Sequence, residues 1–223
     1  MEQKTKRQYR GAGRPTQEQA KRRQRELLEQ ALDMFLKRGY EQTTLDEIAT
    51  SMRMTKRTIY STYGGKEDLF KASVRRAIEK NRVPLEDLQA LQRDDLEATL
   101  KAVARLRIEK FLSPDGTRLQ RIVSAESYRF PELTQMVYTE STGPTVEFLT
   151  ELLKRHTITG DIDVTEPEAC AGIFLNMAVG TPARAVLAGM PPHTSMTHEQ
   201  HIDYCVHLFL YGLIKRSPSP GGT

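Results

Sequence analysis

Apolar residues recur three or four positions apart along almost the whole chain, which is the spacing of one face of an α-helix. One stripe runs through residues 28–35, another through 96–111 and a third through 202–213. No segment shows a convincing alternation of apolar and polar residues, the pattern of a half-buried strand. Because this periodicity determines which side chains a segment can bury, the sequence predicts an all-α fold.

Helix starts are indicated by Thr followed three positions later by Glu or Gln, since each side chain then bonds the other residue's backbone N–H. The pattern occurs at Thr16 with Gln19, Thr44 with Glu47, Thr165 with Glu168, and Thr197 with Gln200. Thr55 is a further candidate cap, and Glu67 and Asp68 suit the positive end of a fourth helix. The first of these signals predict three helices and the start of a fourth within about 65 residues, and Thr165 and Thr197 are predicted to cap the last two helices.

Other helix boundaries follow from glycine and proline. The first helix is expected to end at Gly39, and residues 113–116 are expected to break a long helix before another from about Leu119 to Tyr128. A further helix is predicted from Pro131, kinked at Gly143 and Pro144 and ending near His156. Residues 157–164 are expected to form a loop.

Bulk properties restrict the class of protein. With 38% hydrophobic and 28% charged residues, disorder is expected only at the ends, including a tail at residues 217–223. Cys170 and Cys205 lack a metal-ligand or redox spacing, which favours reduced thiols. No signal peptide is apparent, and the longest apolar stretch, around residues 170–180, is shorter than the roughly 20 residues that cross a bilayer. We therefore expect a cytoplasmic protein without a membrane span.

Charge is distributed unevenly along the chain. Residues 1–66 hold 15 Lys or Arg against 8 Asp or Glu, a net +7, whereas residues 67–223 hold 18 against 21, a net −3. The first 25 residues alone contain nine Lys or Arg and two acids. The basic end is therefore the end expected to meet a polyanion, and residues 1–15, with Arg10 and Arg14, are interpreted either as a flexible arm that follows a DNA groove or as a solvated tail.

Residues 44–63 carry the pattern of a helix-turn-helix, two short helices of which the second enters the DNA major groove. Five apolar residues are expected to fix the pair: Leu45, Ile48, Ala49, Met54 and Ile59. Five polar residues leave the second helix with a cationic outer face: Lys56, Arg57, Thr58, Ser61 and Thr62. That face is the predicted reader of the base edges.

The segment also resembles a known family. It reads T-T-L-D-E-I-A over residues 43–49 and T-K-R-T-I-Y-S-T-Y-G-G-K-E-D-L-F over residues 55–70. In order and spacing this string is similar to the helix-turn-helix of the TetR (tetracycline repressor) family, over roughly residues 16–80. A bare helix-turn-helix pattern is weakly specific, whereas this extended string is strongly specific.

The resemblance implies roles for individual residues. Positions that commonly anchor phosphates in the family match Thr44, Thr55, Thr58, Tyr60, Tyr63 and Lys66, and those that approach bases match Lys56, Arg57 and Thr62. Tyr60 and Tyr63 have the alternative of packing as core aromatics. Arg53 departs from the family pattern, which usually has glycine in the turn; it either alters the turn or accepts a strained backbone while reaching DNA.

The resemblance also implies the organisation of the rest of the chain. Residues 16–66 would form the DNA-binding domain and residues 67–216 a helical domain that binds an effector and forms a homodimer. The segment from Arg118 to Leu133, with R-F-P-E-L at its end, looks like one subset of such C-terminal domains. Dimerisation would use the last two long helices, about 166–188 and 197–215, where small residues and an apolar face occur together.

Candidates for an effector pocket are less well determined. They are Phe111, Glu126, Phe130, Met136, Phe174 and Met177, although an apolar stripe is more often plain core and Glu126 has the alternative of an ion pair with Arg129 or Arg121. His198, His201 and Cys205 share one helical face, which is compatible with a metal or a redox-sensitive thiol but is expected to be simple packing. We therefore predict no metal and no cofactor.

Together these features predict a one-component transcriptional regulator: a dimeric repressor that binds a palindromic DNA operator and is released by an unknown small molecule. An effector-independent DNA-binding protein is one alternative. The other is a small all-α enzyme with its catalytic domain at residues 82–216, for which the sequence offers no nucleophile elbow, paired metal ligands or phosphate loop. We expect the protein not to be an enzyme.

Overall fold

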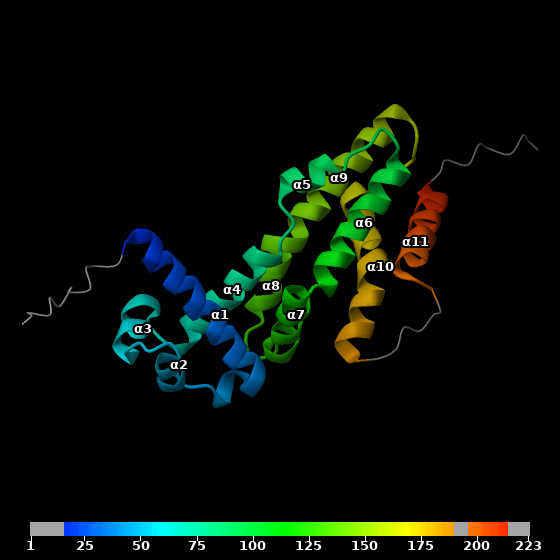
Figure 1. Ribbon diagram of the computed structural model, residues 1–223. Coiled ribbons are helices and arrows are strands. Elements are labelled where there is room, and N and C mark those ends of the chain that lie inside the picture. The colour runs from blue at the N-terminus through cyan, green and yellow to red at the C-terminus, as the bar shows by residue number, and fades with distance from the viewer. Residues whose placement is uncertain (1–15, 190–195, 214–223) are drawn as a thin grey trace, which may run out of the picture.

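A computed structural model describes residues 16–189 and 196–213, which are helical and contain no strand (Figure 1). The all-α prediction is confirmed. The predicted basic arm at residues 1–15, with Arg10 and Arg14, and the predicted tail at 217–223 lie outside the described residues. Within the described ranges no helix is long and apolar enough to cross a membrane.

The first helices are α1 (Gln17–Gln42), α2 (Leu45–Ser51), α3 (Lys56–Tyr63) and α4 (Lys66–Asn81). Thr16 and Thr44 form the predicted capping boxes, and the Thr55 hydroxyl accepts the backbone N–H of Thr58. Gly39, the predicted end of the first helix, has a non-helical φ of 77° and ψ of 167°. It kinks α1, and a further turn continues to Gln42.

The remaining elements are α5 (Leu85–Ala90), α6 (Leu96–Leu112), α7 (Pro114–Glu126), α8 (Glu132–Val137), the π-helical turn η1 (Tyr138–Thr142), α9 (Gly143–Thr159), α10 (Pro167–Ala188) and α11 (His198–Leu213). The break expected at residues 113–116 is confirmed at Ser113, since α6 ends at Leu112. The next helix begins at Pro114 rather than near Leu119, because the Ser113 hydroxyl accepts the N–H of Gly116 and Pro114 opens the helix. The short α5 was not predicted.

Three other boundaries correct the sequence interpretation. The irregularity expected at Gly143 and Pro144 lies one turn earlier, in η1, and Pro144 stands in the first turn of α9. The expected loop at 157–164 begins only after Thr159, where Gly160 adopts the left-handed conformation with φ 83°. At α10 the first helical bond runs from Cys170 N–H to the Glu166 carbonyl, so the helix starts two residues after the predicted cap at Thr165.

Two hydrophobic clusters form the interior. The first joins α1–α4 to α7 and α8 and centres on Phe35, Phe70, Tyr40 and Phe130, whose ring centroids lie 4.8–5.9 Å apart in the contacting pairs. The second joins α5, α6, α9, α10 and α11. In Figure 1, α1–α3 gather at one end, α4 runs from them toward the larger helices, and α11 lies beside α10.

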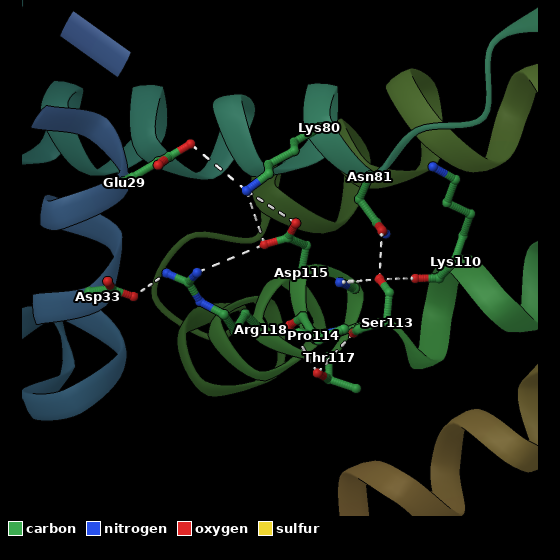
Figure 2. A network of polar contacts seen from close by, with 11 residues as sticks. Glu29, Asp33, Lys80, Asn81, Lys110, Ser113, Pro114, Asp115, Thr117 and Arg118 are labelled. Carbon is green, nitrogen blue, oxygen red and sulfur yellow. Dashed lines mark hydrogen bonds and ion pairs between the residues drawn. The ribbon is translucent and has the colours of Figure 1, made fainter. Parts of the chain in front are cut away.

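A polar network links α1 and α4 to α7 where the three helices meet (Figure 2). Lys80 Nζ of α4 lies 3.1 Å from Asp115 of α7 and 3.9 Å from Glu29 of α1, and Arg118 of α7 pairs with Asp33 of α1. Side chains from three helices thus meet in one cluster. Helices α1–α4 and the larger body, α5–α11, therefore share both an apolar cluster and an ionic junction.

Candidate nucleic-acid interface

The two helices of the predicted helix-turn-helix pack through a small apolar contact. Leu45, Ile48 and Ala49 of α2 and Ile59 of α3 are all buried, and Ile48 and Ile59 are fully so. Met54 lies in the connecting turn, half-buried against the same cluster, and its N–H donates to the Ala49 carbonyl at 2.9 Å. Burial of these side chains leaves the opposite face of α3 to solvent.

Arg53 forms the turn with a positive φ of 50°, the only non-glycine residue of the described part of the chain to do so. The turn therefore has the conformation that a glycine would adopt without strain, and the arginine accepts that strain. Its side chain is exposed. Of the two alternatives for this departure from the family pattern, the geometry favours an unaltered turn that carries an additional cation.

The outer face of α3 presents its cationic and aromatic residues as expected. Lys56, Arg57 and Thr58 are exposed, and Tyr60 keeps 48% of its surface accessible. Lys56 Nζ lies 2.7 Å from Asp46 of α2, and this hydrogen bond raises the pKa of Lys56. Because α3 begins at Lys56, the first backbone N–H groups of the helix lie at the same end as the exposed Lys56 and Arg57 side chains.

The threonine hydroxyls predicted to contact phosphates (Thr44, Thr55 and Thr58) or bases (Thr62) already have partners within the protein. Thr44 Oγ1 contacts Glu47, Thr55 and Thr58 share a hydrogen bond of 2.8 Å between their hydroxyls, and Thr62 donates to the Thr58 carbonyl at 2.9 Å. All four residues are exposed. A hydroxyl has one donor hydrogen, so Thr44 and Thr62 can turn to a phosphate only by giving up an internal bond. In the Thr55–Thr58 pair, the hydroxyl that accepts keeps its hydrogen for another partner.

Two residues predicted to contact phosphates, Tyr63 and Lys66, are partly buried and lie against α1. The Tyr63 hydroxyl is buried against α1, and burial raises the pKa of Tyr63. Lys66 turns its ammonium toward the end of α1, where it donates to the Glu41 carbonyl at 3.1 Å and lies 4.3 Å from the Tyr40 ring centroid. Burial lowers the pKa of Lys66. Both side chains thus contact α1 in the free protein, and their contacts with phosphates stay predictions.

A groove beside α3 adds residues that the motif did not indicate. It has a volume of about 820 Å³ and lies between the first half of α1 and the start of α3. Arg22 and Arg23 of α1 line it together with Arg53, Thr55 and Thr58. The excess of basic residues before position 26 was the only sequence signal for these two arginines. They widen the cationic surface around α3.

The six predicted pocket residues do not gather around one cavity. Phe130 and Met136 belong to the first cluster, and Glu126 accepts the backbone N–H of Tyr40 at 2.9 Å. The predicted ion pair of Glu126 with an arginine is wrong, because Arg129 pairs with Glu41 instead.

The other three candidates lie in or beside the second cluster. Phe174 is buried in it, with its ring centroid 5.0 Å from that of Phe209, and Met177 packs against the same cluster. Only Phe111 lines a cavity of the larger body, one of about 660 Å³ between α6 and α10. The apolar stripes are therefore mostly core.

The histidine and cysteine face of α11 also packs internally. His201 Nε2 lies 3.0 Å from the Ala178 carbonyl of α10, and Cys205 Sγ lies 3.6 Å from the Met177 carbonyl. Burial raises the pKa of the Cys205 thiol, which disfavours the reactive thiolate. His198 is exposed at the start of the helix. These contacts support the packing interpretation of this face.

The fold and the exposed cationic second helix define a class of protein, the helix-turn-helix DNA-binding regulators. Two family models match the chain: "Bacterial regulatory proteins, tetR family" over residues 27–73 and "AefR-like transcriptional repressor, C-terminal domain" over residues 98–212. The protein belongs to the TetR family of transcriptional regulators, which are not enzymes.

Individual relatives agree with this assignment. An uncharacterised HTH-type transcriptional regulator of Bacillus subtilis, YezE, is 35% identical over 65 residues, 29% of this chain and 34% of that protein. IcaR of Staphylococcus epidermidis, a negative transcriptional regulator of the biofilm operon icaADBC, is 35% identical over 48 residues, 22% of this chain and 26% of IcaR. The chain thus matches about a third or less of the length of these relatives.

Solved structures resemble almost the whole chain. A TetR-family regulator from Mesorhizobium loti shares the fold, with a TM-score of 0.72 at 23% identity over 88% of this chain and 98% of that one. The flavonoid-responsive regulator FrrA gives a TM-score of 0.71 at 25% identity over 88% of this chain and all of FrrA.

Proposed function

We propose that this protein is a cytoplasmic, dimeric repressor that binds a palindromic DNA operator and dissociates when a small molecule binds its helical body. The observation that carries the proposal is the exposed face of α3, where Lys56 and Arg57 stand at the helix start beside the groove lined by Arg22, Arg23 and Arg53. Phosphate contacts from this surface would orient α3 in the major groove, and its polar side chains would read base edges.

Dimerisation is supported by the outer surfaces of α10 and α11. Ile173 keeps 61% of its surface exposed, Tyr204 52%, Leu208 45% and Tyr211 65%. Large apolar residues clustered on adjacent helices are typical of a surface that a partner covers. A twofold dimer would place two α3 helices on successive major grooves, about 34–36 Å apart, and so select a palindrome.

The packing of α4 supports a mechanism in which a ligand releases the repressor from DNA. Because α4 packs against α1, α7 and η1, a shift of the body would change the position of α3 relative to its twin. A ligand that prefers the shifted state lowers DNA affinity by its difference in binding free energy between the two states, typically 1–3 kcal/mol. FrrA is a flavonoid-responsive regulator, which supports a small-molecule effector for this chain too.

A gel-shift titration with fragments from around the protein's own gene tests DNA binding. The full chain should retard a palindromic fragment, with affinity falling steeply as salt rises. The double variant Lys56→Ala/Arg57→Ala should lose at least about tenfold in affinity, since charged contacts to DNA are removed.

A matched control is the double variant Lys154→Ala/Arg155→Ala, an adjacent and exposed Lys-Arg pair on α9. Its DNA affinity should remain that of the wild type. If Lys56→Ala/Arg57→Ala binds the fragment as tightly as the wild type does, the proposal that α3 reads the DNA is wrong. An effector-independent DNA-binding protein would bind the fragment but show no saturable small-molecule binding in calorimetry against a compound library.

A further inference from the structure

The larger body contains a cavity of about 660 Å³ between α6, α7, η1, α9 and α10. Its apolar lining includes Phe111, Val146, Leu175 and Val179, and one of its polar lining residues is Arg107 of α6. The volume falls within the range of about 300–1,000 Å³ that is usual for small-molecule sites. A cavity of this kind can accept a molecule with an apolar body.

Arg107 is an unusual residue for such a lining. Its Nε atom is buried without a hydrogen-bond partner, and its Nη1 contacts only the Ser141 carbonyl, at the long distance of 3.5 Å. In the part of the chain that the structure describes, it forms no ion pair. Burial lowers the pKa of Arg107, which reflects the cost of holding a cation away from water and counter-charge. The guanidinium therefore has N–H donors that are not used within the protein and can bind an anion.

The acidic residues of the same cavity lie elsewhere on its wall. Glu166 and Glu168 stand at the start of α10, where the positive end of the helix stabilises them, and both side chains are exposed. They would repel a second negative charge near the exposed part of the site. The charge pattern thus favours a ligand with one anionic group at its buried end and an uncharged body.

We propose that this cavity binds an amphipathic monocarboxylate whose carboxylate pairs with Arg107. The proposal rests on the proposed function, since it assigns a chemical class to the effector. A planar guanidinium matches a carboxylate through two parallel hydrogen bonds, and apolar lining residues such as Phe111 and Leu175 would contact the rest of the molecule. Occupation would supply the counter-charge that Arg107 lacks.

The same pairing gives a route to the DNA-binding helices. Ser141, which accepts the weak contact from Arg107, belongs to η1, and the neighbouring Glu140 accepts a hydrogen bond of 3.0 Å from Arg75 of α4. Single π-turns of this kind often occur at functional sites. A carboxylate that binds Arg107 would replace the contact between Arg107 and the Ser141 carbonyl of η1. Because Glu140 of η1 is hydrogen-bonded to Arg75, this change would reach α4.

Isothermal titration calorimetry on the full chain tests the proposal with two matched pairs of probes, cinnamate with cinnamamide and decanoate with decanamide. At least one acid should bind at least about tenfold more tightly than its amide, because hydrogen bonds between charged partners are the stronger ones. Arg107→Gln should abolish this preference, and Arg107→Lys should retain part of it. Arg121→Gln, which removes an exposed arginine from α7, should leave it unchanged.

Three results would each overturn the assignment: no saturable binding of either acid, equal binding of acid and amide by the wild type, or a preference that survives in Arg107→Gln. The wild-type comparison does not depend on whether a variant folds. Binding of the operator fragment by the ligand-free protein is measured separately. If that binding is present while the acids fail, the ligand class is wrong and the regulator assignment stands; if it is absent, the proposed function itself fails.

Discussion

Lys56, the first residue of α3, donates a hydrogen bond to the carboxylate of Asp46 in the first turn of α2, with 2.7 Å between Nζ and Oδ2. Both side chains are exposed on the surface proposed to meet DNA. The acid therefore neutralises one of the cations of the reading helix in the free protein. Its charge would also repel nearby phosphates.

Asp46→Asn should accordingly increase DNA affinity several-fold. Removal of the acid frees Lys56 to pair with a phosphate, so the slope of log affinity against log salt should steepen by about 0.9. Fluorescence anisotropy with a labelled operator fragment at several salt concentrations measures both quantities. Asp163→Asn, which removes an exposed acid before α10, serves as the control and should change neither. Unaltered affinity and slope in Asp46→Asn would show that the pair persists in the complex or lies off the DNA.

Arg53 combines a strained backbone with a charge beside α3, so its substitution should separate stability from binding. Arg53→Gly relieves the φ of 50° and should raise the free energy of unfolding by about 1 kcal/mol. The same change removes a cation from the groove and should weaken DNA binding. Urea denaturation and anisotropy measure the two effects. Arg53→Lys keeps the charge and the strain and should resemble the wild type in both; a less stable glycine variant would refute the account of the turn.

Local signals were predictable from the sequence, and side-chain directions were not. The capping boxes at Thr16, Thr44 and Thr197 involve residues three positions apart, so the chain itself determines them. Tyr63 and Lys66 fit the motif equally well, but the Tyr63 hydroxyl is buried and Lys66 donates to the Glu41 carbonyl, 25 positions earlier in the chain. No local pattern contains that information.

The pocket candidates failed for a related reason. Periodicity identifies which face of a helix is buried, and Phe130 and Phe174 are indeed buried. It does not identify the helix that covers that face, which decides whether a residue lines a cavity or packs in a core. Arg107 was missed because an isolated arginine on a helix is usually solvated, and only the assembled body shows that its Nε is enclosed.

The exposed apolar residues of α10 and α11 give a prediction about assembly. Leu208→Glu should shift the protein toward monomers, because a charge buried at a subunit interface loses its hydration without a partner. The affinity of Leu208→Glu for the operator should fall as well, since a monomer presents one α3 helix to DNA where a dimer presents two. Analytical ultracentrifugation and a gel shift measure the two effects. Ile158→Glu introduces the same charge on α9 at a residue that is 85% exposed, and this control should stay dimeric. A dimeric Leu208→Glu protein would place the interface elsewhere.

The junction in Figure 2 gives a prediction about how the two parts are held together. Lys80 and Asp115 lie 3.1 Å apart and are both partly exposed, so their interaction should stabilise the protein by only about 0.2–1 kcal/mol. A double-mutant cycle with Lys80→Gln and Asp115→Asn, read by urea denaturation, isolates this coupling from the effects of each change alone.

The coupling between Lys80 and Asp115 should depend on salt, because the Debye length falls from about 30 Å at 0.01 M to about 3 Å at 1 M ionic strength. We expect a measurable coupling at the lower ionic strength and almost none at the higher. The matched cycle with Lys154→Gln and Glu151→Gln removes a pair at 2.7 Å within α9. The coupling within that α9 pair should depend on salt in a similar way, but removing the pair should not affect ligand-induced release of DNA. Lys80→Gln/Asp115→Asn should weaken this release, because α4 and α7 then move more independently. Release that is unchanged in Lys80→Gln/Asp115→Asn would leave the apolar cluster, with Phe70 and Phe130 in contact, as the connection between the two parts.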